Sequence, residues 1–127
     1  MKRFLTAIAL MSLPMIATPT TLMTAPASAA VATSKLGDIS AMRKIVADTL
    51  VLVNAGNIKG AIKRVTEFET AWDKNASKLK KLDSKTWAKL DEASDIALST
   101  VRYPSATPDE MKKDLSALLA VMDNPNS

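Results

Sequence analysis

The chain has 127 residues, contains neither cysteine nor histidine, and carries 17 basic against 13 acidic side chains. The lack of cysteine excludes disulfides, thiolate metal sites and covalent haem attachment. The lack of histidine excludes histidine as a catalytic base, a metal ligand or a phosphate carrier. With only three glycines, the chain also has no glycine-rich phosphate loop. We therefore expect a protein that is not an enzyme and that uses no cofactor.

Residues 1–29 have the layout of a secretory signal peptide. Lys2 and Arg3 form a positive segment, an apolar run follows over residues 4–13, and Ala27-Ser28-Ala29 supplies the small residues that signal peptidase recognises. Cleavage is expected after Ala29, with cleavage after Ala30 as the alternative. The apolar run is too short and too interrupted to span a bilayer. We expect a periplasmic or secreted protein whose mature chain has no integral membrane segment.

The mature chain would carry a smaller charge than the full sequence. The signal segment contains two of the basic residues and none of the acidic ones, so residues 30–127 carry a net charge of +2. Proteins that bind nucleic acid usually have a strongly basic domain, so no nucleic-acid partner is expected. The remaining length suits one domain with a modest core.

The first half of this domain predicts a helical hairpin. Apolar side chains recur every three or four positions over residues 39–53 and again over residues 58–79, as in amphipathic helices. Between them, Gly56 can adopt the left-handed conformation that ends a helix, and the short connection favours antiparallel packing. The expected buried side chains are Ile39, Met42, Val46, Leu50 and Val53, followed by Ile58, Ile62, Val65, Phe68, Trp72 and Leu79.

The second half predicts two further helices. Asp83 or Ser84 can cap the third helix, and Pro104 ends it. Thr107, Pro108 and Glu110 have the spacing of a capping box for the fourth, which Asn124-Pro125 ends. The expected buried side chains are Trp87, Leu90, Ser94, Ala97, Leu98 and Val101, followed by Met111, Leu115, Leu118, Leu119 and Met122.

Four amphipathic helices with short connections predict an all-α fold. The expected architecture is a four-helix up-down-up-down bundle that forms a single domain over residues 30–127. The alternative is a stack of two helical hairpins, because residues 52–61 resemble the turn of a tetratricopeptide repeat. A second copy of that pattern is not present in the sequence.

Charged side chains on or beside the apolar stripes allow two interpretations. In the first, Arg43 and Arg102 neutralise Glu69, Asp73 or Asp95 in structural ion pairs, and we favour it because buried charges are normally paired. In the second, carboxylates of the second and third helices bind a hard divalent cation such as Ca²⁺ or Mg²⁺. The metal ligands would then be Glu69, Asp73, Asp91 and Asp95.

The tryptophans and the lysines also have two interpretations each. Trp72 and Trp87 are expected as core anchors rather than as platforms for a ligand. Six lysines gather near the junction of the second and third helices, where they form either a solvated corner or a site for an anionic partner or lipid headgroups. These lysines are Lys74, Lys78, Lys80, Lys81, Lys85 and Lys89.

A family resemblance covers residues 58–102. It rests on Val65-Thr66-Glu67-Phe68-Glu69-Thr70-Ala71-Trp72-Asp73, Leu79-Lys80-Lys81-Leu82-Asp83, Trp87, Leu90-Asp91, Asp95-Ile96-Ala97-Leu98 and Val101-Arg102. This pattern resembles a group of small exported proteobacterial proteins of unknown function, from which the chain departs at Lys81, where the group has proline. Some members carry the label "histidine kinase", which cannot apply to a chain without histidine. The resemblance implies an exported α-helical domain and names no substrate. Its recurring positions would be Glu69, Trp72, Asp73, Trp87, Asp91, Asp95 and Arg102.

Together these observations predict a non-enzymatic periplasmic helical-bundle protein. It would act as a binding or accessory module for a protein partner in the cell envelope. The alternative function is the binding of a divalent cation or a small ligand by the carboxylates of the second and third helices.

Overall fold

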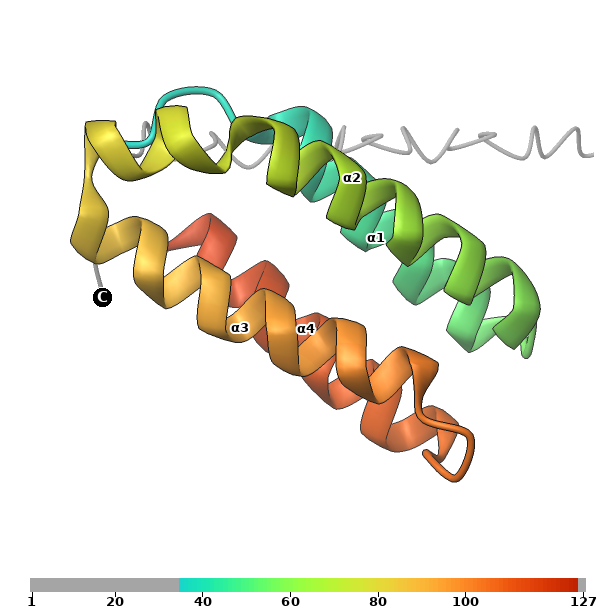
Figure 1. The fold of residues 1–127 in the computed structure, drawn as a ribbon. Coiled ribbons are helices and arrows are strands. Elements are labelled where there is room, and N and C mark those ends of the chain that lie inside the picture. The colour runs from blue at the N-terminus through green and yellow to red at the C-terminus, as the bar shows by residue number, and fades with distance from the viewer. Residues whose placement is uncertain (1–34, 126–127) are drawn as a thin grey trace, which may run out of the picture.

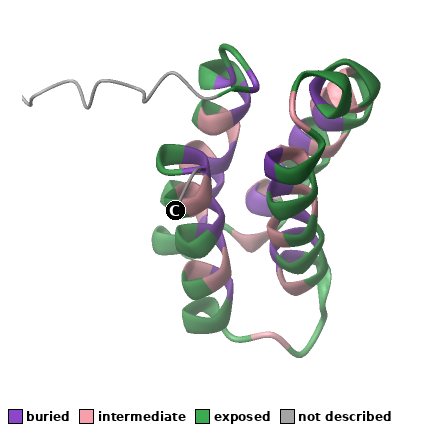
Figure 2. Ribbon diagram, turned by 90° about the vertical axis from the view of Figure 1, so that its left-hand side faces the viewer, coloured by how far each residue is buried: buried purple, intermediate pink, exposed green. Residues whose placement is uncertain are grey.

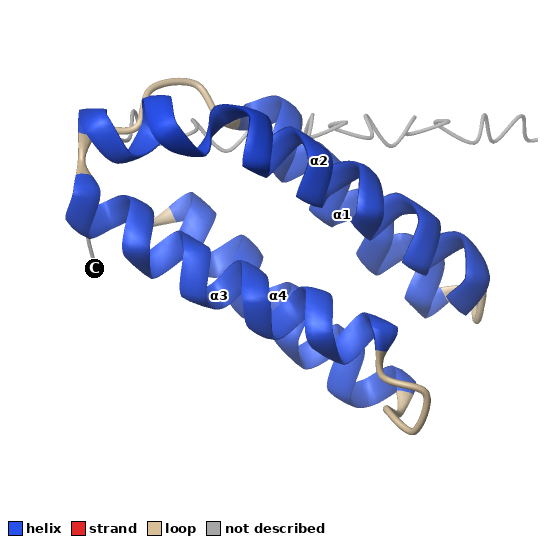
Figure 3. Ribbon diagram, viewed as in Figure 1, coloured by secondary structure: helices blue, strands red, loops and turns tan. Residues whose placement is uncertain are grey.

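The computed structural model describes residues 35–125, and their regular structure consists of helices alone (Figure 3). The helices are α1 (Ser40–Asn54), α2 (Ile58–Leu82), α3 (Ser84–Arg102) and α4 (Pro108–Asp123). Within this described part, no helix is both long enough and apolar enough to cross a membrane. The predicted signal peptide and its cleavage site lie outside the described residues.

The helices form two antiparallel hairpins that pack face to face. Helix α1 packs against α2 and α4, and α3 packs against α2 and α4, so each helix has two neighbours around a closed ring (Figure 1). In a stack of tandem hairpins α1 would instead pack against α3. The structure therefore confirms the four-helix up-down-up-down bundle.

Local sequence signals fix the ends of the helices. After α1, Gly56 has φ of 74°, and the backbone N–H groups of Gly56 and Asn57 donate to the carbonyls of Val53 and Leu52. This is the Schellman arrangement that satisfies the last carbonyls of a helix. At α4, the predicted capping box between Thr107 and Glu110 is present, with Pro108 at the first helical position.

The core lies between the two hairpins, where the buried sides of all four helices meet (Figure 2). Phe68, Leu90 and Leu115 are fully buried, as the apolar periodicity predicts. The prediction for Ile62 is wrong, because 38% of this residue is exposed. The preceding residue, Ala61, takes the core position, which rotates Ile62 to the border of the buried stripe.

Candidate functional site

Six lysines occupy one end of the bundle, where α2 meets α3. We call this group, consisting of Lys74, Lys78, Lys80, Lys81, Lys85 and Lys89, the lysine corner; all six residues are exposed. Only Asp83 separates the two helices. The last turns of α2 and the first turns of α3 therefore lie at the same end of the bundle (Figure 1). The corner is therefore held by two helices rather than by a long loop.

The single carboxylate of the corner is used to cap α3. Asp83 accepts hydrogen bonds from the backbone N–H groups of Lys85 and Thr86, both at 3.1 Å, and from the Thr86 hydroxyl at 2.9 Å. The bonds from the Thr86 backbone and hydroxyl hold the pKa of Asp83 below its ordinary value. Asp83 forms no ion pair with a described lysine, so it does not neutralise the corner.

The charge of the described chain is strongly asymmetric. Residues 74–89 contain six lysines and one aspartate, which gives this stretch a net charge of +5. The other described residues contain nine basic and twelve acidic side chains, so they carry a net charge of −3. The net charge of +2 on residues 35–125 thus combines a cationic stretch around the α2–α3 junction with a net negative charge on the other described residues.

The two kinds of basic side chain are used differently. All three arginines in residues 35–125 form ion pairs: Arg43 with Asp123, Arg64 with Asp48 and Glu67, and Arg102 with Glu69. In contrast, no carboxylate of a described residue lies within ion-pair distance of four corner lysines. These four are Lys74, Lys78, Lys81 and Lys85. The corner therefore presents ammonium groups that the fold itself does not neutralise.

Apolar side chains lie among these ammonium groups. Leu82, the last residue of α2, is 52% exposed. Trp87 is half-buried and packs against the core, and the Nζ atom of Lys80 lies 4.9 Å from the centre of its ring. This distance is within the range of a cation–π interaction. The corner thus combines exposed charges with one exposed aliphatic side chain at its tip.

Of the two arginines predicted to form structural ion pairs, Arg102 has one of the predicted partners and Arg43 does not. Arg102 pairs with Glu69, whose pKa is lowered chiefly by this hydrogen bond. Arg43 pairs with Asp123 rather than with Glu69, Asp73 or Asp95, and its Nη2 atom donates to Asp123 at 2.8 Å. The antiparallel packing of α1 and α4 places the start of one helix beside the end of the other. That neighbour cannot be identified from the periodicity of α1 alone.

The four carboxylates predicted as metal ligands have separate surroundings. Glu69 is held by Arg102, and Asp91 accepts a hydrogen bond of 2.8 Å from the indole nitrogen of Trp72. Asp73 and Asp95 are exposed and form no hydrogen bond or ion pair with a described residue. Across residues 35–125, no three aspartate or glutamate side chains gather in a way that could hold a metal ion.

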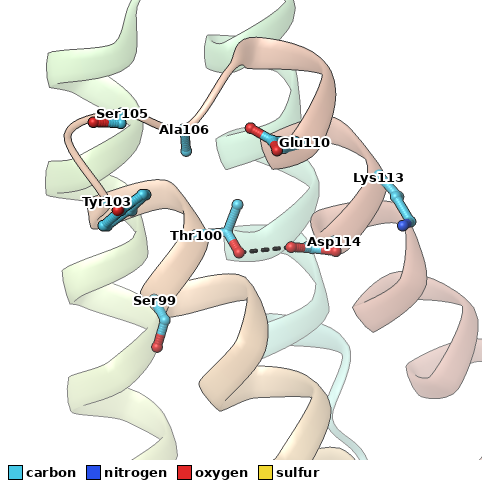
Figure 4. A pocket seen from close by; sticks show the side chains of 8 residues that line it. All are labelled: Ser99, Thr100, Tyr103, Ser105, Ala106, Glu110, Lys113 and Asp114. Atoms are coloured by element: carbon cyan, nitrogen blue, oxygen red, sulfur yellow. Dashed lines mark hydrogen bonds between the residues drawn. The ribbon is translucent and has the colours of Figure 1, made fainter.

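A second surface feature, not foreseen from the sequence, is an open pocket at the opposite end of α3. It has a volume of about 400 Å³ and lies between the end of α3 and the start of α4 (Figure 4). Thr100 donates a hydrogen bond of 2.6 Å to Asp114 across it, and Glu110 is occupied in the capping box. The sequence signals in this region, Pro104 and the capping box, predict its turns but carry no information about a hollow between them.

Comparisons of the chain with models of protein families, with curated proteins and with solved structures return no match. The resemblance seen over residues 58–102 therefore stays a prediction. The candidate site is assigned from its own geometry and charge.

Proposed function

We propose that this protein is a non-enzymatic accessory protein of the cell envelope that binds an anionic partner through the lysine corner. The observation that carries this proposal is the net charge of +5 over residues 74–89 in a chain whose other described residues carry −3. The signal-peptide pattern of residues 1–29 supports the location.

The concentration of charge has an energetic cost to the folded protein. Ammonium groups held on adjacent helical turns repel one another, and no described carboxylate forms an ion pair with Lys78, Lys81 or Lys85. A bundle that needed only solubility could distribute these charges over its surface. A concentrated positive field instead accelerates and orients the approach of a negatively charged partner.

The available side chains support binding rather than catalysis. Without histidine or cysteine, the chain has neither a histidine base nor a cysteine nucleophile. The corner can therefore supply electrostatic attraction and apolar contact.

Salt-dependent binding to isolated cell envelopes tests this proposal. The full chain is expressed with its own export segment and recovered from the exported fraction. Its sedimentation with envelopes is then measured at about 0.05 M and about 0.3 M salt. The distance over which opposite charges attract one another becomes shorter as the salt concentration rises. The test variant replaces Lys78, Lys81 and Lys85 by Gln. Lys80 is left in place because it contacts Trp87.

A matched control replaces Lys59, Lys63 and Lys113 by Gln. These three lysines are also exposed and form no ion pair with a described residue, so the control has the same change in net charge at other positions. We expect binding at low salt by the wild type and the control, and its loss in the test variant and at high salt. Equal binding by all three proteins, or no binding by any, would refute the proposal. Thermal melting checks that each variant is folded.

A further inference from the structure

We infer that the anionic partner is the surface of a phospholipid bilayer, on which the bundle stands with its α2–α3 end toward the lipid headgroups. This inference rests on the proposed function and names its partner. In this arrangement the lysines of the corner lie at the level of the phosphates, and Leu82 enters the headgroup layer.

The choice of lysine over arginine favours a fluid anionic surface. Arginine presents a rigid fork that matches one carboxylate or phosphate, whereas lysine is a point charge on a flexible stem. In residues 35–125 every arginine pairs with a specific carboxylate of the bundle, and the lysine corner contains no arginine. A set of point charges suits phosphates whose positions are not fixed, and clusters of four to eight basic side chains are typical of surfaces that bind anionic lipid.

The exposed leucine gives a second, independent indication. Leu82 is 52% exposed and stands in the sequence between Lys81 and Lys85, at the point where α2 ends. An aliphatic side chain flanked by ammonium groups matches the boundary between phosphates and acyl chains. A partner that was only a charged polymer in water would offer Leu82 no apolar contact.

The charge of the rest of the bundle defines one orientation. Because the other described residues together carry −3, an anionic surface attracts the lysine corner and gains no net attraction from the rest of the bundle. The connections between α1 and α2 and between α3 and α4 lie at the other end of the bundle (Figure 1). Both are therefore expected to point away from the lipid.

Lys35 adds to the charge of the same end. It lies close enough to Asp83 for its charge to contribute to the lowered pKa of that carboxyl. The described chain thus begins beside the lysine corner.

Vesicles of defined composition test the inference. The full chain is mixed with vesicles of phosphatidylglycerol and phosphatidylethanolamine, or with vesicles of phosphatidylcholine alone, and the bound fraction is measured by flotation. Each lysine near an anionic surface changes the partition coefficient about fivefold at low salt. Replacement of Lys78, Lys81 and Lys85 by Gln should therefore weaken binding to the anionic vesicles by about a hundredfold. The control at Lys59, Lys63 and Lys113 should change it by a few-fold at most.

A fluorescent label tests the orientation. Since the chain has no cysteine, Leu82→Cys and Val51→Cys each create one attachment point for a dye that responds to an apolar environment. Val51 is 64% exposed on α1 and serves as the control position. A rise in emission on anionic vesicles at position 82 and none at position 51 is expected. An equal rise at both positions would overturn the proposed orientation.

The outcomes separate the two proposals. If the protein binds envelopes but not anionic vesicles, and protease treatment of the envelopes abolishes that binding, then the partner is a protein and the lipid inference fails while the proposed function stands. If it binds neither envelopes nor vesicles, both proposals fail. Binding to anionic vesicles that is lost in the corner variant and retained in the control supports both.

Discussion

Replacing each tryptophan by phenylalanine removes the same indole N–H from two different surroundings. The Trp72 nitrogen donates to an Asp91 carboxylate oxygen at 2.8 Å, and the residue is only 3% exposed. The Trp87 nitrogen is buried, and no described group accepts its hydrogen bond. The two substitutions should therefore have unequal effects on the free energy of unfolding.

The expected loss of stability in Trp72→Phe depends on how well Asp91 is solvated once it has lost its hydrogen bond. A hydrogen bond to a charged group contributes about 1.5–3 kcal/mol. Asp91 is only half-buried, so water can solvate it in Trp72→Phe and the lower part of that range applies. The space left beside Phe68, whose ring stacks on Trp72 at 6.0 Å, adds a cavity cost. We expect Trp72→Phe to destabilise the fold by about 2–3 kcal/mol.

Trp87→Phe should be nearly neutral. An unsatisfied buried N–H costs about 1–3 kcal/mol, and its removal offsets the lost packing and the weaker contact with Lys80. The variants should therefore differ by about 2 kcal/mol. In a domain of this size that corresponds to a difference of roughly 8–16 °C in melting temperature.

Thermal unfolding followed by far-ultraviolet circular dichroism measures this difference. Asp91→Ala in the wild type and in Trp72→Phe completes a double-mutant cycle that isolates the hydrogen bond. Equal melting temperatures for the two phenylalanine variants, or a coupling energy near zero in the cycle, would refute the assignment of Asp91 as the partner of Trp72. Asp91→Asn retains an acceptor and should be milder than Asp91→Ala.

Three further predictions concern pH, a turn and export. Hydrogen bonds lower the pKa of Glu69, Asp83 and Asp123, so the unfolded chain binds more protons in acid, and the melting temperature should fall as pH drops below about 4.5. Since the chain has no histidine, the melting temperature should be nearly constant between about pH 6 and 8, and a histidine-like step there would contradict this. Gly56→Ala should cost about 1 kcal/mol because φ is +74° while the added methyl meets open space. Gly56→Asn, tolerated in the left-handed region, should cost less in the same melting assay, and equal losses would argue against backbone strain as the cause. Mass spectrometry of the exported protein should find an N-terminus at Ala30 or Val31, and full-length protein confined to the membrane fraction would exclude cleavage.

The parts of the fold that local chemistry determines are those that the sequence predicts well. The cap at Thr107, the turn at Gly56 and the buried stripe through Phe68 each depend on residues within one or two helical turns. Ile62, which was predicted to be buried but is partly exposed, shows a limit of prediction from periodicity. Periodicity assigns a stripe about 100° wide, and whether Ala61 or Ile62 occupies its centre depends on how closely the facing helix approaches.

The candidate site could not be predicted in full from apolar periodicity, because periodicity does not show which helices are neighbours. The lysines of the corner are visible in the sequence, but whether distant carboxylates neutralise them depends on which helices are neighbours. The ion pair of Arg43 shows this, because Asp123 lies at the far end of the described chain. Trp72 and Trp87 both lie on the apolar stripes of their helices, so the sequence predicts the same role for them. Only the packing distinguishes the bonded N–H of Trp72 from the unpaired N–H of Trp87.

The ring order of the helices has a consequence for the folding pathway. Three of the four helix–helix interfaces join helices that follow one another in the chain, whereas α1 meets α4 through side chains 80 residues apart, as in the Arg43–Asp123 pair. Closing so long a loop costs more chain entropy than forming either hairpin. The two hairpins are therefore expected to form first, and the docking of α4 against α1 to complete folding. Each hairpin thus forms from a continuous stretch of the chain, whereas the closed ring needs the first and the last helix together.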